Sequence, residues 1–221
     1  ITHTLYLAYA TLQCGEGVLT SIEDHATIEP RIGGGIQVEP IPIGELRQYS
    51  ATLPRFLLQV FHGKAITLWQ DLIQTIFDIY VDWHFAGIRS FPELKSRQTK
   101  IDLRSNESIE VQVQRQLKRD FGFDKYKDRV KLINDIRNTS ADRSNELFEV
   151  SKHVAVRNAF QHQDGVLDEY ALKDHGRASF ELLDDSGKQI AFSAGDSLLL
   201  SLPEFVRLQK SLLLAAQAWR S

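Results

Sequence analysis

The spacing of hydrophobic residues predicts a mainly helical protein from about residue 49 onward. Residues 65–85 form a long apolar segment, in which hydrophobic side chains recur every three or four positions from Leu68 to Ile79. This spacing is typical of a helix with one buried face. Gly87 follows the segment as the expected C-terminal stop.

Three further helices are expected in the middle of the chain. Residues 55–62 form a short apolar run, which we expect to end at Gly63 as a separate helix. Residues 106–121 give a second helix that stops at Gly122, and residues 125–137 give a third.

The most clearly defined helix spans residues 140–164. Leu147, Val150 and Val154 form its apolar stripe, and Gly165 is placed to end it. Beyond this helix, the alternating pattern predicts a β-hairpin at about residues 177–193.

The last helix is expected over residues 204–219. It starts from Ser201, Pro203 and Glu204, which together have the pattern of a capping box with proline in the first turn. Residues 1–48 contain many glycines and prolines, which favours short strands or an irregular segment. We therefore divide the chain into an N-terminal segment, 1–48, and a helical domain, 49–221.

Composition agrees with a single globular domain. The chain has 221 residues, of which 43% are apolar and 25% are charged. Its formal net charge of −3 argues against a globally basic nucleic-acid binder. A local basic face is still open, because residues 95–137 hold 12 Lys or Arg against 7 Asp or Glu.

The cysteine content and the hydropathy of the sequence indicate its cellular location. Cys14 is the single cysteine of the sequence, so no intrachain disulfide can form. The sequence has no apolar run near the ~18 residues that a membrane span requires. The N-terminus also lacks the pattern of a signal peptide. These features predict a cytoplasmic protein with no membrane association.

Candidate chemistry lies at the end of the 140–164 helix. One turn beyond Val154, the apolar stripe becomes a polar cluster of Arg157, Asn158, Gln161 and His162. Polar side chains on an inward face must be hydrogen-bonded, so the cluster is either a structural network or a site. Arg157 and His162 are five positions apart, so they converge only obliquely or with the help of a second chain.

These residue types suit metal-free cleavage of RNA. Arginine binds and stabilises phosphate, histidine moves protons near neutral pH, and asparagine orients its neighbours. No group of acidic residues with metal-ligand spacing accompanies Arg157, Asn158 and His162, so neither a metal nor another cofactor is expected. The string His62-Gly63-Lys64 is too short to indicate a site.

The segment 156–165 resembles the motif of the HEPN superfamily, in the form Arg-Asn-x-x-x-His-x-x-Gly. HEPN domains are antiparallel helical bundles that commonly form homodimers, and many are metal-independent ribonucleases of toxin–antitoxin, phage-defence or RNA-processing systems. The resemblance implies that Arg157 and His162 are catalytic and that Asn158 shapes the site. It also implies a site composed from two chains.

The resulting expectation is an endoribonuclease that cleaves RNA, such as tRNA or another structured RNA, by 2′-hydroxyl transesterification in a toxin–antitoxin, defence or stress system. An antitoxin protein is a further partner that the resemblance implies. Asp71, Asp78 and Gln161 are expected to support the site. One alternative is a non-catalytic HEPN-like module that binds RNA, nucleotide or a protein partner. Another is an oligomerisation domain braced by Arg157 and Asn158.

Overall fold

The computed structural model describes residues 15, 17–28, 39–95, 97–137 and 144–219. Within them the protein is mainly helical with two short antiparallel strand pairs, so the predicted fold class is confirmed. The elements are β1 (Thr27–Ile28), β2 (Ile41–Pro42), α2 (Ile43–Phe85), α3 (Pro92–Lys95), α4 (Ile109–Phe123), α5 (Tyr126–Arg137), α6 (Ser144–His162), α7 (Glu169–Asp174), β3 (Phe180–Leu183), β4 (Gln189–Phe192) and α8 (Leu202–Ala218).

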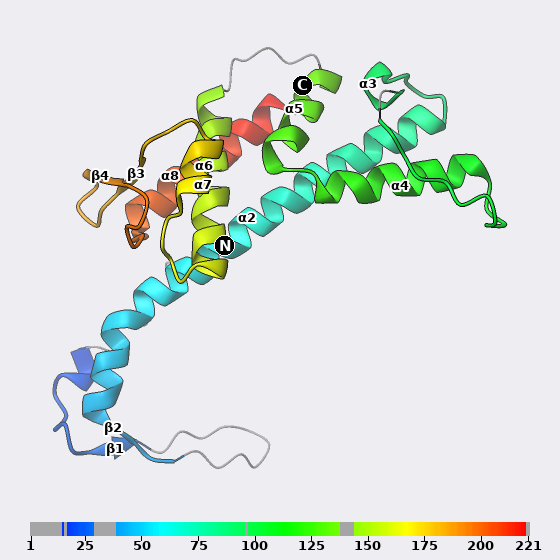
Figure 1. Cartoon of the computed structure of the whole chain (residues 1–221). Coiled ribbons are helices and arrows are strands. Elements are labelled where there is room, and N and C mark those ends of the chain that lie inside the picture. Colours follow the sequence, from blue (N-terminus) through cyan, green and yellow to red (C-terminus); the bar gives the residue numbers. More distant parts are fainter. Residues whose placement is uncertain (1–14, 16, 29–38, 96, 138–143, 220–221) are drawn as a thin grey trace.

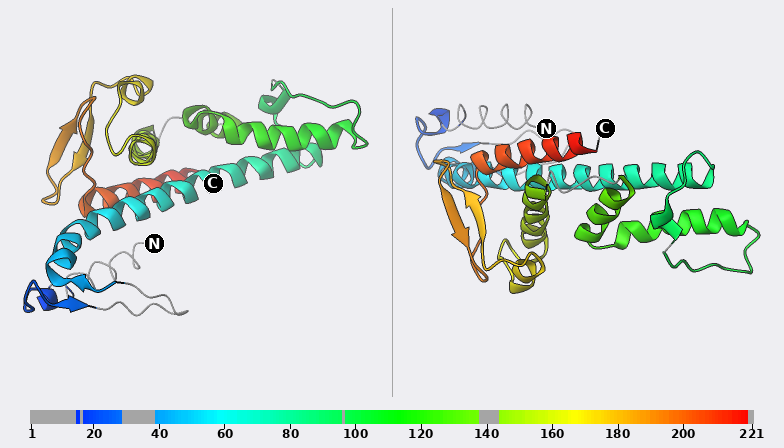
Figure 2. Two further views of the ribbon diagram at one scale, coloured as in Figure 1. Left: turned by 60° about the horizontal axis from the view of Figure 1, so that its bottom comes forward. Right: turned by 90° about the horizontal axis from the view of Figure 1, so that it is seen from above.

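Helix α2 extends through the whole molecule (Figure 1). The prediction of a separate helix ending at Gly63 is wrong, because α2 continues through this position. A glycine inside a helix costs about 1 kcal/mol. Its neighbours His62 and Ile66 are fully buried against the other helices, and this packing outweighs that cost. The helix bends in its N-terminal third, the part of the sequence that holds Pro54 (Figures 1 and 2).

The main hydrophobic core lies along the C-terminal half of α2, where α4, α5 and α8 pack against it. The rings of Phe77 and Phe121 stack with their centroids 3.9 Å apart, and those of Trp69 and Trp219 stack at 5.1 Å. The indole N–H of Trp69 donates to the hydroxyl of Tyr126 at 2.8 Å, so these two polar groups are paired within the core.

Helix α4 includes Gly122 and ends at Phe123, so the prediction that Gly122 stops it is wrong. Phe121 is fully buried against α2, and this contact holds the last turn in helical form. The predicted helix over residues 125–137 is confirmed as α5.

Helix α6 crosses α2 at a steep angle (Figure 2) and ends close to the predicted glycine. Asp164 and Gly165 have positive φ angles of 51° and 81°, and the amide of Gly165 donates to the carbonyl of Ala159 at 3.0 Å. A Cβ atom at Gly165 would lie 3.2 Å from the ring of Phe160, so both conformation and space favour glycine.

The predicted hairpin forms between α7 and α8, and β3 pairs with β4 in antiparallel register. At the start of α8, the hydroxyl of Ser201 accepts from the amide of Glu204 at 3.2 Å, as predicted. The capping box also predicts that the Glu204 side chain accepts from the Ser201 amide, and this part of the prediction is wrong. The Glu204 carboxylate accepts instead from the amide of Leu183 in the hairpin, at 2.8 Å.

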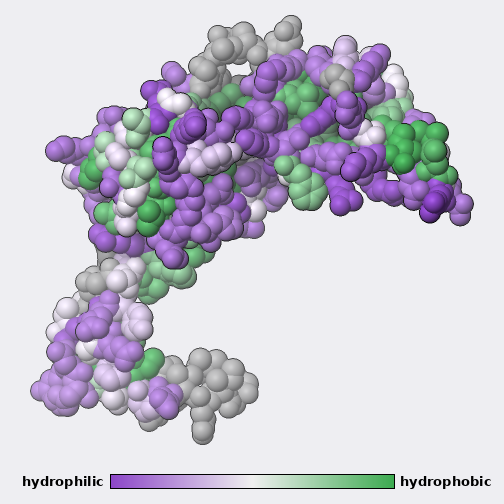
Figure 3. Space-filling model, viewed as in Figure 1, coloured by the Kyte–Doolittle hydropathy of each residue, from purple (hydrophilic) through white to green (hydrophobic). Residues whose placement is uncertain are grey.

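The N-terminal part of α2 leaves the helical body and carries β1 and β2 at its end (Figure 1). α2 begins at Ile43, so it crosses the boundary that we placed after residue 48. Phe56 is 59% exposed and Val60 is 50% exposed on this projecting part, and Figure 3 shows hydrophobic atoms along it. Despite this apolar surface, no helix in the described ranges has the length and hydropathy to cross a membrane.

Candidate functional site

The predicted motif residues lie at the C-terminal end of α6. Asn158 and His162 are exposed, whereas Arg157 is half-buried. The guanidinium of Arg157 donates from Nη1 to the Asn158 Oδ1 atom at 3.1 Å. Its Nε atom is buried and has no hydrogen-bond partner among the described residues. Arg157 and Asn158 therefore act as a contiguous pair.

A cavity of about 390 Å³ lies beside this pair, between α6, the start of α5, and α7. This volume falls within the usual range of small-molecule sites, about 300–1,000 Å³. Asn158 and His162 line the cavity, and Lys125, Lys127 and Tyr170 line it from the neighbouring elements. The structure thus brings two of the three predicted catalytic residues into one concave site.

Arg157 does not line this cavity, and it makes no direct contact with His162 in the part of the chain that the structure describes. Asn158 is the link, because it contacts Arg157 and also borders the cavity. The expected supporting residues lie elsewhere. Asp78 bonds to Gln74 on α2, and the charges of Asp71 and Asp78 act on Arg129 of α5. Gln161 is exposed and is not among the cavity-lining residues.

Two lysines supply positive charge to the cavity. Lys125 Nζ lies 3.0 Å from the hydroxyl of Tyr170, and this hydrogen bond raises the pKa of Lys125. Lys127 Nζ bonds to Asp174 at 2.5 Å, which lowers the pKa of that carboxyl. Lys125 is therefore charged at neutral pH, and it has no carboxylate partner among the hydrogen bonds of the described residues.

A second histidine, His175, also lines the cavity, and sequence reasoning gave it no role. Its Nδ1 lies 2.8 Å from the Ala171 carbonyl, and its Nε2 lies 2.8 Å from the Ser151 hydroxyl. Ser151 and His162 are 11 residues apart on α6, or about 16 Å along the axis. His175 is therefore too far from His162 for both to act on one phosphate group.

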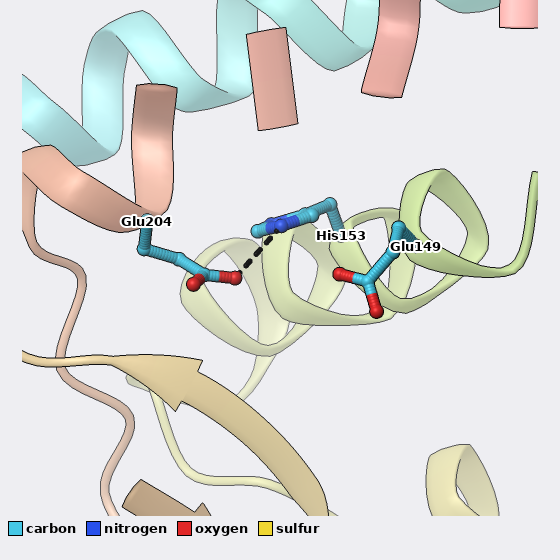
Figure 4. Close-up of side chains that lie close together, drawn as sticks. All are labelled: Glu149, His153 and Glu204. Carbon is cyan, nitrogen blue, oxygen red and sulfur yellow. Dashed lines mark ion pairs between the residues drawn. The ribbon is translucent and has the colours of Figure 1, made fainter. Parts of the chain in front are cut away.

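A buried ionic network occupies the other side of α6, where α6 meets α8 and the hairpin. Glu204 has 0% exposure, and its Oε1 atom lies 3.0 Å from His153 Nε2. Figure 4 marks this pair with a dashed line. The same oxygen lies 3.3 Å from Lys152 Nζ and 2.8 Å from the Arg207 guanidinium. Lys152 also bonds to Glu149 at 2.7 Å.

The network continues into α2 through a pair of histidines. His62 Nε2 lies 3.1 Å from His153 Nδ1, and both side chains have 0% exposure. His153 thus presents Nε2 to the Glu204 carboxylate and Nδ1 to His62. The chain Glu204–His153–His62 thus joins α8, α6 and α2.

Burial and charge set the protonation of this network. Burial lowers the pKa of His62 well below its ordinary value, and the neighbouring His153 and Arg157 lower it further. Burial likewise lowers the pKa of His153, although its bond to Glu204 opposes this. For Glu204, burial alone would raise the pKa, but the contacts with His153, Lys152 and the Leu183 amide bring it to about 2. Both histidines are neutral and Glu204 is ionised at neutral pH.

Glu149, His153 and Glu204 offer one ligand atom each within 4.8 Å of one another, as a metal site would require (Figure 4). The donor set does not fit a metal. The Lys152 ammonium already bonds to both carboxylates, and Arg207 adds a second cation at Glu204. A metal ion would meet these two positive charges, so the three residues belong to the ionic network.

A cavity of about 460 Å³ opens over this network, between α6 and the hairpin. Glu149, Lys152 and Arg207 line it, and their charges are paired with one another. This pairing leaves the 390 Å³ cavity beside the motif as the stronger candidate for a functional site.

Sequence reasoning missed the whole network. One signal was available, because Lys152 and His153 lie between Val150 and Val154, the buried residues of the α6 stripe. The position of Glu204 was misleading, because its spacing from Ser201 indicates a helix cap and not a buried ionic network. The sequence around His62 gave no signal of the network, because its partner His153 is 91 residues away.

No protein-family model, curated protein or solved structure matches the chain. The interpretation of the site therefore rests on the motif and on its geometry.

Proposed function

We propose that this chain is a metal-independent endoribonuclease of the HEPN type. The observation that carries the proposal is the exposed polar end of α6, where Asn158 and His162 border a cavity that also holds Lys125 and Lys127. Ammonium groups attract the phosphates of a nucleic acid, and they need not touch the bases to do so. A concave site with a histidine and two lysines is therefore suited to a phosphodiester.

The reaction needs two proton transfers and stabilisation of a charged intermediate. The ribose 2′-oxygen attacks the adjacent phosphorus, and the bond from phosphorus to the 5′-oxygen breaks. A base takes the proton of the 2′-hydroxyl, and an acid protonates the leaving 5′-oxygen. We assign one of these transfers to His162 and assign Arg157 to the charge on the phosphorane. The products carry a 2′,3′-cyclic phosphate and a 5′-hydroxyl.

We further propose that the working site forms between two copies of the chain. Within one chain, Arg157 bonds to Asn158 but does not line the cavity that holds His162. Apposition of two α6 ends would bring Arg157 of one copy to His162 of the other. Each copy then supplies the arginine that is absent from the cavity of the other copy.

Cleavage of total RNA and of tRNA in excess EDTA tests the proposal. The wild type should cleave, leaving the ends named above, and His162→Ala should abolish cleavage while retaining the wild-type circular dichroism spectrum. His25→Ala is the matched control, because His25 is an exposed histidine far from α6 in the sequence. Equal cleavage by the wild type and His162→Ala would refute the catalytic assignment.

A non-catalytic binding module is the second candidate, and one observation favours it. Within one chain the cavity has the positive charges of Lys125 and Lys127 for binding, but Arg157, which cleavage would need at the phosphorane, does not line it. Intact RNA after prolonged incubation, together with RNA binding that Arg157→Ala weakens, would support this candidate over the enzyme.

A further inference from the structure

The cavity beside the motif carries an aromatic side chain that the proposed chemistry does not use. Tyr170 lies in the first turn of α7 and is 64% exposed. Its ring lies beside Lys125, whose Nζ is 5.7 Å from the ring centroid and 3.0 Å from the hydroxyl. An exposed aromatic ring with a fixed cation combines a stacking surface with a phosphate-attracting charge.

The position of Tyr170 relative to the motif is fixed by its neighbours. Asp168 caps α7, because its Oδ1 accepts from the Ala171 amide at 2.6 Å. The other oxygen of Asp168 bonds to Gln163, directly after α6. The start of α7 is therefore tied to the end of α6, and Tyr170 borders the same cavity as His162.

We infer that Tyr170 and Lys125 form a substrate-positioning subsite, in which an unpaired base stacks on Tyr170 and the adjoining phosphate meets Lys125. This inference rests on the proposed function for the identity of the ligand as RNA. A base inside a duplex has both faces covered by its neighbours, so a single protein ring can stack only on a base that is unpaired or terminal. The subsite thus selects single-stranded segments, and it places the neighbouring phosphate near His162.

Binding of a non-cleavable probe tests the subsite without requiring catalysis. The probe is a fluorescein-labelled 12-nucleotide 2′-O-methyl RNA, which has no free 2′-hydroxyl, and its blunt duplex serves for comparison. Fluorescence anisotropy should show tighter binding of the single strand. Tyr170→Ala should weaken that binding on the order of tenfold, because stacking on an aromatic ring is worth about that much per base.

Three further variants identify the cause of the loss. Tyr170→Phe retains the ring and should bind like the wild type, while Tyr49→Ala is the matched control, since Tyr49 is 62% exposed on the projecting part of α2. Lys125→Gln should lower the slope of log affinity against log salt by about one, as expected for one lost phosphate contact.

The outcomes separate the subsite from the ribonuclease proposal. Unchanged binding by Tyr170→Ala, equal affinity for duplex and single strand, or no measurable probe binding would each overturn the subsite, even if the wild type cleaves RNA. Binding that depends on Tyr170, in a protein that leaves unmodified RNA intact, would support the subsite and refute the ribonuclease.

Discussion

Lowering the pH from 7.5 to 5.5 should lower the free energy of unfolding by up to about 3 kcal/mol, because burial disfavours protonation of His62 and His153 inside the fold. Burial lowers the pKa of both side chains, whereas a histidine in the unfolded chain titrates near 6.5. Below that value the unfolded state binds protons that the folded state excludes. The stability contribution is therefore complete above pH 6.5 and is lost as the pH falls.

The magnitude follows from one pH unit at each histidine. A group that stays neutral in the folded state costs about 1.4 kcal/mol for each unit below its unfolded pKa. Two such groups at pH 5.5 set an upper limit of about 3 kcal/mol on the loss. Glu204 acts in a separate window: its pKa is lowered to about 2, so its contribution is present above about 4.5 and is lost as the pH falls from there toward 2.

Urea unfolding at pH 7.5, 6.5 and 5.5 measures this loss, with the fluorescence of the buried Trp69 and Trp219 as the signal. His62→Phe should reduce the loss by at least about half, whatever its effect on stability at pH 7.5, because the pKa of His62 is lowered more strongly than that of His153. His162→Gln removes an exposed histidine and should leave the loss as in the wild type. A His62→Phe protein with the same pH dependence as the wild type would refute the reasoning.

Three substitutions test other parts of the fold by the same unfolding assay. Glu204→Gln should destabilise the protein by about 3–5 kcal/mol, since it removes the buried carboxylate that Lys152 and Arg207 share; a loss below 1 kcal/mol would show that the network is dispensable. Phe77→Ala should cost about 3–5 kcal/mol, because it opens a cavity against Phe121; retention of the wild-type urea midpoint would contradict this packing. Gly165→Ala should cost about 1–2 kcal/mol from its positive φ and its approach to Phe160, and a more stable variant would argue against this conformation.

The elements that could be predicted from the sequence are those governed by local signals. The stripe from Leu147 to Val154 and the glycine at position 165 were enough to predict α6, and alternation around a tight turn predicted the hairpin. Gly63 and Gly122 misled the prediction of helix ends. At both positions the packing of neighbouring residues against other helices outweighs the local cost of glycine.

The candidate site was predictable only in part. Asn158 and His162 belong to a recognisable motif, and both border the cavity. Lys125 comes from the start of α5, and Tyr170 and His175 come from α7 and its C-terminal end, and no local pattern indicates that they meet α6 at one cavity. Their convergence depends on how α5 and α7 pack, which the hydrophobic pattern does not encode.

The projecting part of α2 has a consequence for measuring the assembly state. This part carries β1 and β2 away from the helical body, so the described part of the chain is elongated (Figure 1). An extended particle diffuses more slowly than a sphere of equal mass, so a single copy will elute early from a size-exclusion column and resemble a dimer. The number of copies that share the α6 site therefore has to be counted by mass itself, through light scattering or sedimentation equilibrium, where shape does not enter.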